Sequence, residues 1–190
     1  MNRLRILFMA AVAIATVFGV SGVAVSADLQ QKLIEESAIE QVAKRGLLRV
    51  GMSTFVPWAM TDKSGNLIGF EIDVATRLAQ DMGVKVEFVP TKWAGVIPAL
   101  LTGKFDVIIG GMGILAQRNL KVNFSIPYDH SGVAIVAHKQ LANGFSRLED
   151  FNRSDVAVVA RLGSTSAAAA NKFLPKAQKR FFDDESQVIQ

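Results

Sequence analysis

The alternation of apolar and polar positions predicts a first β-α-β-α-β run in this chain. Apolar strands are expected at 47–52, 84–88 and 105–109, with helices at 70–82 and 93–102 between them. The helix over 70–82 carries its apolar residues on one face, and the strand over 105–109 is apolar enough for burial on both faces. Strands that alternate with helices indicate a parallel sheet covered by helices.

A second run of the same kind follows after an interruption. An extended strand is predicted at 132–137, and a polar connection follows it. Strands at 156–159 and 180–182 then flank an alanine-rich helix that ends near Phe173. Two α/β units joined by an extended segment predict two lobes with a cleft between them. The predicted boundaries are 28–138 for the first lobe, 139–146 for the connection and 147–190 for the second lobe.

The N-terminus has the pattern of a secretory signal peptide. Arg3 and Arg5 precede an apolar run of about 15 residues, and small residues lead to Ala27. The apolar part is short for a membrane span, which needs about 20 residues. We therefore expect a signal peptide over 1–27, cleavage after Ala27 and export to the periplasm. A helix is predicted over 30–45, with Gly46 as its stop.

Composition argues against several kinds of partner and site. The chain has no cysteine, so neither a disulfide nor a lipid anchor on cysteine is available. Without the two arginines of the signal segment, the formal net charge falls from +4 to +2. That charge is small and unclustered, which argues against a nucleic-acid partner. His130 and His138 have one adjacent acid, Asp129, so a metal site is not expected.

The glycine-rich stretch over 110–118, GGMGILAQR, first suggests a dinucleotide cofactor. Gly111-x-Gly113-x-x-Ala116 fits that fingerprint, and Asp129 lies near the position of a ribose-binding acid. A dinucleotide fold needs a full helix after the glycines, however, and barely two turns fit between Gly113 and Val122. The fingerprint also follows the third strand instead of the first. No cofactor is therefore expected.

Several motifs together resemble the family-3 extracellular solute-binding proteins. The helix signature GFEIDVATRLA over 69–79 is the most specific match. The surrounding residues agree in order: Arg49-Val50-Gly51-Met52, Phe55-x-Pro57-Trp58, Trp93-x-x-x-Ile97-Pro98-x-Leu100, Phe105-Asp106, Arg118, Phe124-Ser125-x-Pro127-Tyr128 and Gly163-Ser164-Thr165. The likeness covers roughly residues 46–190. It implies a two-lobe, type II periplasmic-binding-protein fold. It also implies that the protein closes on an amino acid and delivers it to an ABC importer.

The resemblance also implies site residues. Arg118 would hold the ligand's α-carboxylate through its planar fork. Backbone N–H groups near Gly111 and Gly113 would complete the anion site. Phe55 and Trp93 would sandwich the apolar part of the ligand. Ser164 and Thr165 would add donors from the second lobe, at the start of its first helix.

The sequence departs from the family at one contact position. Gly113 stands where the family usually has Ser or Thr, which puts the amino-acid specificity in doubt. The family's acid for the ligand ammonium group would lie beyond Gln190. Since family members are longer, the second lobe is expected to be truncated and the chain to be a fragment, prone to aggregation and weak in binding.

Three functions stay open at this point. The first is a periplasmic binding protein, monomeric and without catalysis, that works with an ABC permease. The second is a periplasmic dehydratase of the cyclohexadienyl dehydratase type, which would need a general acid or base in the cleft. The third is the sensor domain of a membrane receptor, which would need a transmembrane helix downstream.

Overall fold

The computed structural model describes residue 29 and residues 37–189, which fall in two compact units, 1–46 and 47–190. In the first unit, helix α2 (Ala38–Arg45) ends at Gly46, as the sequence predicts, and Val42 is its buried residue. Ala27 and the signal peptide lie outside the described residues, as does most of the N-terminal part of the helix predicted over 30–45.

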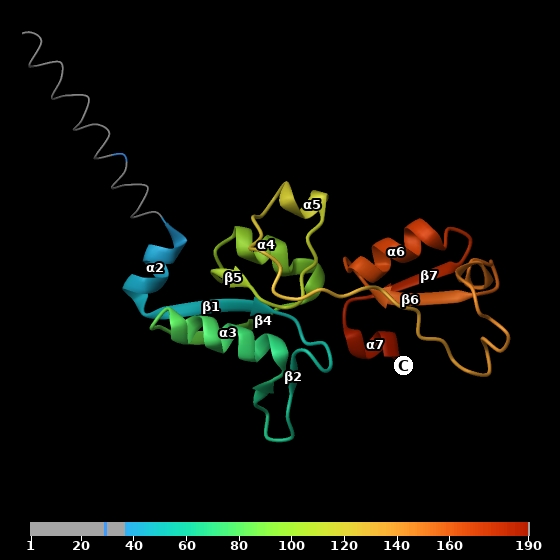
Figure 1. Cartoon of the computed structure of the whole chain (residues 1–190), viewed down its shortest axis with the longest axis horizontal. Helices are drawn as coiled ribbons and strands as arrows, with labels where there is room; N and C mark the ends of the chain where they lie inside the picture. The colour runs from blue at the N-terminus through green and yellow to red at the C-terminus, as the bar shows by residue number, and fades with distance from the viewer. Residues whose placement is uncertain (1–28, 30–36, 190) are drawn as a thin grey trace, which may run out of the picture. The chain divides into compact units, whose positions relative to one another are not determined.

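The second unit alternates strands and helices over most of its length (Figure 1). The elements are β1 (Leu47–Met52), β2 (Met60–Thr61), β3 (Leu67–Ile68), α3 (Phe70–Asp81), β4 (Lys85–Pro90), η1 (Trp93–Gly95), α4 (Val96–Leu101), β5 (Val107–Ile108), α5 (Ala116–Asn119), η2 (Leu148–Phe151), β6 (Ala157–Arg161), α6 (Thr165–Phe173), β7 (Gln178–Phe182) and α7 (Glu185–Ile189).

The first sheet is parallel, with strand order β4-β1-β5. The chain moves from β1 to β4 on one side and then crosses back over β1 to reach β5. Because such crossovers are right-handed, opposite directions of travel place α3 and α4 on opposite faces of the sheet. Figure 1 shows this arrangement, with β1 between the two helices.

Large apolar side chains form the core around this sheet. Val50 and Met52 of β1 are fully buried, and Ile72 of α3 packs beside Met52. On the other face Phe105 packs with Trp93 and Val96 of α4. The approach is close: a Cβ on Gly51 would lie 2.2 Å from the Phe105 ring. Glycine at this position therefore makes room for the aromatic side chain.

The second sheet contains two parallel strands, β6 and β7, joined by α6. This β-α-β unit confirms the run predicted from the sequence, and the short helix α7 follows its last strand. Its buried residues are smaller than those of the first sheet, with Ala160 in β6 and Ala167 and Ala170 in α6. Leu174, which is 3% exposed, is the largest of the buried apolar side chains among the described residues of this part of the chain.

Two predictions about strands are wrong. Residues 132–137 form no strand, and Val136 is 97% exposed. An apolar run becomes a strand only when a neighbouring strand pairs with it, and no such pairing occurs within the described residues. Strand β5 is shorter than expected, and Val107 and Ile108 are only half-buried. Within the described residues it pairs on one side only, with β1, so it is an edge strand, and its half-buried side chains show that its faces are not fully covered.

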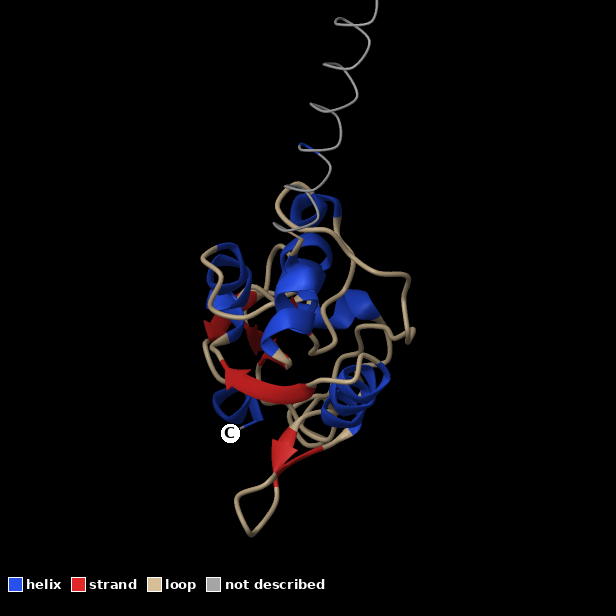
Figure 2. Cartoon of the chain, turned by 90° about the vertical axis from the view of Figure 1, so that its left-hand side faces the viewer, coloured by secondary structure: helices blue, strands red, loops and turns tan. Residues whose placement is uncertain are grey.

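Other details agree with the sequence. The regular part of the helix predicted over 93–102 begins at Val96, after a 3-10 turn, so Pro98 falls in its first turn. Strands β2 and β3 form a small hairpin, and Gly65 in its turn adopts φ 88°, which glycine accepts readily. Figure 2 shows this hairpin projecting with its loop outermost. Among the described helices, none is both long and apolar enough to span a bilayer.

Candidate ligand-binding site

The carboxyl ends of the first sheet's strands gather most of the predicted site residues. Phe55 follows β1, Trp93 follows β4, and Gly111 and Gly113 follow β5. In an open α/β sheet, ligands bind at this edge where the strand order reverses direction. Here the reversal occurs at β1, which lies between β4 and β5. The topology therefore explains why these residues, far apart in the sequence, share one edge.

The second sheet contributes the turn that leads from β6 into α6. Gly163 adopts φ 73°, a left-handed conformation that glycine accepts readily. Ser164 is the N-cap of α6, and its Oγ accepts a hydrogen bond from the N–H of Ala167 at 3.1 Å. Its hydroxyl oxygen therefore stabilises the helix start. Thr165 is the first residue of α6 and is half-buried.

Arg118 of α5 is held by backbone carbonyls. Its Nη1 donates to the Gly113 carbonyl at 2.8 Å, and its Nη2 donates to the Gly163 carbonyl at 3.0 Å. The guanidinium carbon also lies 5.8 Å from the centroid of the Trp93 ring. Partial burial lowers the pKa of Arg118, but an arginine stays protonated at any physiological pH. Arg118 is thus a fixed, half-buried positive charge at the sheet edge.

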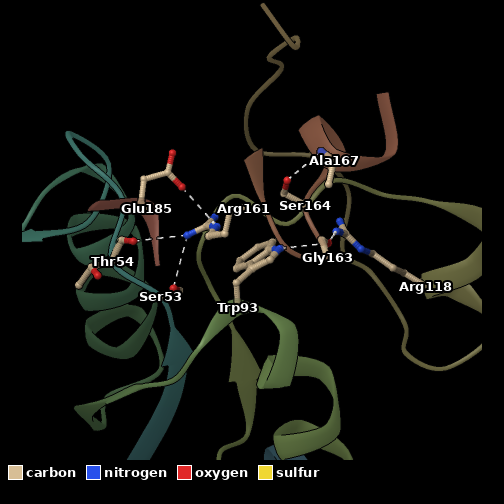
Figure 3. A network of polar contacts seen from close by, with 9 residues as sticks. All are labelled: Ser53, Thr54, Trp93, Arg118, Arg161, Gly163, Ser164, Ala167 and Glu185. Carbon is tan, nitrogen blue, oxygen red and sulfur yellow. Dashed lines mark hydrogen bonds and ion pairs between the residues drawn. The ribbon is translucent and has the colours of Figure 1, made fainter. Parts of the chain in front are cut away.

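Trp93 and Arg118 meet at the same acceptor. The Nε1–H of Trp93 donates to the Gly163 carbonyl at 3.2 Å, beside the bond from Arg118 (Figure 3). Trp93 is only 5% exposed. One carbonyl from the second β-α-β unit therefore joins two residues of the first.

The glycine stretch approaches other site residues closely. Gly111 has φ 65°, and a Cβ there would lie 3.0 Å from the Phe55 ring and 3.3 Å from Oε1 of Glu71. A Cβ on Gly113 would lie 3.3 Å from Cγ2 of Thr165. Gly113, the position that lacks the family's hydroxyl, therefore lies next to a threonine of the second β-α-β unit.

An open cavity of ≈ 640 Å³ borders this edge. Four of the seven predicted ligand-binding residues line it: Phe55, Gly111, Gly113 and Thr165. Trp93, Arg118 and Ser164 do not belong to its lining, although Arg118 binds the carbonyl of Gly113. The structure therefore brings the predicted residues to one neighbourhood but spreads them over the cavity and the polar network beside it.

Arg161 is a site residue that the sequence analysis missed. It ends β6, is 8% exposed, and its guanidinium lies over the rings of Trp93 and Phe55, at 4.6 and 5.5 Å from their centroids. The Nε lies 3.4 Å from Oε2 of Glu185 (Figure 3). The available signal was an arginine at the end of the apolar strand VAVVA, a position where a charge is unusual.

Glu71 is a second residue whose environment the sequence did not reveal. In the sequence it stands only as one residue of the helix signature over 69–79, yet it is 3% exposed. The Tyr128 hydroxyl donates to its Oε2 at 2.7 Å. Burial raises the pKa of Glu71, while the bond from Tyr128 acts in the opposite direction. Glu71 also lines the cavity, so a buried carboxyl with a raised pKa lies beside the predicted site.

Metal ligation finds no support in the described part of the chain, where no three His, Cys, Asp or Glu side chains gather. Asp106 lies in the strand predicted over 105–109 and forms an ion pair with Arg49. Its Oδ1 accepts from Arg49 Nη2 at 3.0 Å and its Oδ2 from the Arg49 backbone N–H at 2.8 Å. This pair ties the strand β1 to the segment before β5.

Comparison with known proteins agrees with this geometry. The model of the bacterial extracellular solute-binding proteins, family 3, matches residues 48–184. The L-cystine-binding protein TcyJ of Escherichia coli (strain K12) is 30% identical over 174 residues, which are 90% of this chain and 65% of that protein. Cyclohexadienyl dehydratase of Pseudomonas aeruginosa is 29% identical over 166 residues, 87% of this chain and 61% of that protein.

A solved structure is similar over most of the chain. It is the ancestral amino acid-binding protein AncCDT-1, described as a precursor of cyclohexadienyl dehydratase. The identity is 47%, the TM-score is 0.79, and the match covers 81% of this chain and 68% of that one.

The chain belongs to family 3 of the bacterial extracellular solute-binding proteins. The α/β, type II periplasmic-binding-protein fold class predicted from the sequence is thereby confirmed. The chain spans 65% and 61% of the lengths of the two curated relatives named above.

Proposed function

We propose that this protein captures a small amino acid, or a related carboxylate, and delivers it to an ABC importer. The observation that carries the proposal is Arg118. It is a half-buried cation at the carboxyl edge of the first sheet, and it is fixed by two carbonyls from different parts of the chain. Supporting evidence comes from the family and from relatives whose names describe amino-acid binding.

The chemistry follows from the geometry of the guanidinium. Arginine has five N–H donors, and the two bonds to carbonyls leave three for a ligand. A carboxylate accepts two of them side by side, which gives both orientation and strength. Backbone N–H groups near Gly111 and Gly113, and the start of α6 at Thr165, would add donors to the same anion. Phe55, which lines the cavity, would contact the apolar part of the ligand.

The signal-peptide pattern over 1–27 supports a site of action outside the cytoplasm. Cleavage after Ala27 would release the protein into the periplasm, where it would act as a monomer that meets the permease of an ABC transporter. The extracellular family supports this location. No catalytic step belongs to this proposal.

Calorimetric titration of the purified protein with each of the common amino acids tests the proposal. We expect saturable binding of at least one of them with a stoichiometry of one. If no amino acid binds while a solute of another class does, the proposal is wrong.

One observation favours a second candidate, a dehydratase. Glu71 is a buried carboxyl with a raised pKa that lines the cavity, which is the environment of a general acid. A relative named cyclohexadienyl dehydratase supports the same idea. Incubation of the purified protein with prephenate and arogenate decides the matter. Turnover that Glu71→Gln abolishes would establish the enzyme, and no turnover leaves the binding function.

A further inference from the structure

Arg161 is a buried cation whose polar contacts are long. Its Nη1 lies 3.4 Å from both the Ser53 Oγ and the Thr54 carbonyl. Its Nε forms no hydrogen bond, although it lies 3.4 Å from Oε2 of Glu185. Hydrogen bonds from guanidinium to oxygen are usually 2.7–2.9 Å when one or both partners are charged. A buried charge with such partners is poorly compensated for its loss of water.

The partner carboxylate is also poorly placed to compensate it. The Glu185 side chain is 35% exposed, whereas that of Arg161 is 9% exposed. Glu185 begins the five-residue helix α7, so water competes for its oxygens. Glu185 therefore neutralises part of the charge of Arg161 but leaves donors of the guanidinium without a close acceptor.

Arg161 and Arg118 lie over the same ring. Their guanidinium carbons are 4.6 and 5.8 Å from the Trp93 centroid (Figure 3). Arg161 also lies over Phe55, at the place where the aromatic pair was expected to hold the ligand's side chain. A ligand bound to Arg118 by its α-carboxylate would thus direct its side chain toward a second arginine.

We propose that Arg161 selects ligands with a second carboxylate, such as acidic amino acids, and disfavours ligands with a cationic side chain. This inference rests on the proposed function. The second carboxylate would displace Glu185 and accept from the donors of Arg161 that lack a close partner. A cationic side chain would instead bring a third positive charge beside two that are already partly removed from water, which is unfavourable.

Matched ligand pairs test the selection by charge at nearly constant shape. Calorimetry with glutamate and glutamine, and with aspartate and asparagine, gives the preference of the wild-type protein for the acid over its amide. We expect the wild type to prefer the acid at least tenfold and to bind lysine and arginine more weakly than either. Arg161→Leu should lower the affinity for the acid by about 30-fold or more, and should leave the affinity for the amide nearly unchanged.

Two further variants show whether a change in binding comes from the charge of Arg161 or from a loss of folding. Arg180→Leu removes an exposed arginine from the adjacent strand β7 and should leave the preference unchanged. Glu185→Gln removes the carboxylate that competes with the ligand, so the acid should bind several-fold more tightly. Circular dichroism reports whether each variant is folded. If Arg161→Leu does not fold, Glu185→Gln decides alone.

The outcomes separate this inference from the function beneath it. If no amino acid binds to the wild type, the proposed function and this inference both fail. If neutral or cationic amino acids bind best, or if Arg161→Leu keeps the wild-type preference for the acid, only this inference fails. Weaker binding of the acid by Glu185→Gln would likewise overturn it, because Arg161 and Glu185 would then form a purely structural pair.

Discussion

The two β-α-β regions of this protein, residues 47–109 and residues 147–189, are stabilised in different ways. The first region buries large side chains on both faces of its sheet, including Met52, Trp93 and Phe105. The second region buries mainly alanines around α6, and Val159 and Phe173 are 42% and 51% exposed. Because burial free energy scales with apolar area, the first region has the larger hydrophobic core per residue.

The contacts that join the two regions are largely polar. The Gly163 carbonyl accepts from Trp93 and Arg118, and Lys92 lies 3.6 Å from Asp183 in an exposed ion pair. The aromatic rings of Trp93 and Phe55 take part through the guanidinium of Arg161, which lies over both. Polar contacts of this kind cost little to exchange for contacts with water or a ligand, since water satisfies the same groups. We infer that the first region is the rigid platform of the site and that the second is the part able to move upon binding.

Two phenylalanines test the difference between the two cores most strongly. Phe105→Ala should lower the free energy of unfolding by about 3–5 kcal/mol, because Phe105 is 1% exposed and fills the core against Gly51. Phe173→Ala in α6 should cost only about 0.5 kcal/mol, since half of its side chain already contacts water. Urea denaturation of the two variants measures both values. Similar losses would show that the two regions depend on their cores equally.

Two serines at the start of α6, the N-cap Ser164 and Ser166, test whether local polar contacts stabilise the second region. Ser164→Ala removes the N-cap acceptor of the Ala167 N–H and should cost about 1 kcal/mol. Ser166→Ala, its matched control, changes an exposed position inside the helix, where alanine is the better helix former. The control should be neutral or slightly stabilising in the same denaturation assay. An equal response of the two variants would contradict the capping role.

The smallest expected effect is a pH dependence from Glu71 in the first region. Its pKa is raised in the folded protein, so the folded state binds more protons than the unfolded state above the ordinary glutamate value of 4.5. The stability that this group contributes is fully present below that value and is lost as the pH rises through the raised folded pKa. Glu71→Gln should flatten this part of the stability profile, measured by denaturation at a series of pH values. An unchanged slope in the variant would assign the dependence to other groups.

Periodicity predicted the first region well. Strand β1 has the predicted bounds, 47–52, and helix α3 spans 70–81 where 70–82 was expected. These elements pack large apolar residues at regular spacing, and such patterns are visible in the sequence. The same method failed at 132–137, because an apolar run does not reveal whether a partner strand is available.

The chemistry of the site was only partly visible in the sequence. Family motifs indicated Arg118, and the structure places it beside Gly113, Trp93 and Gly163. Arg161 was missed because its importance lies in contacts with residues about 70 and 106 positions away in the chain, Trp93 and Phe55. The burial of Glu71 likewise depends on Tyr128, 57 residues later. Sequence spacing carries no information about such long-range pairs without a family motif.

The proposed function depends above all on the binding of the ligand's α-carboxylate by Arg118. The most direct measurement is calorimetric titration of the wild type, Arg118→Lys and Arg118→Ala with the amino acid that binds best. Arg118→Ala should weaken binding by about 2–5 kcal/mol, and Arg118→Lys should weaken it clearly, because lysine keeps the charge but lacks the fork. The α-amide of the same amino acid, which lacks the negative charge, should bind weakly and almost equally to all three proteins. Equal affinity of the three proteins for the free amino acid would contradict the claim and place the binding site elsewhere.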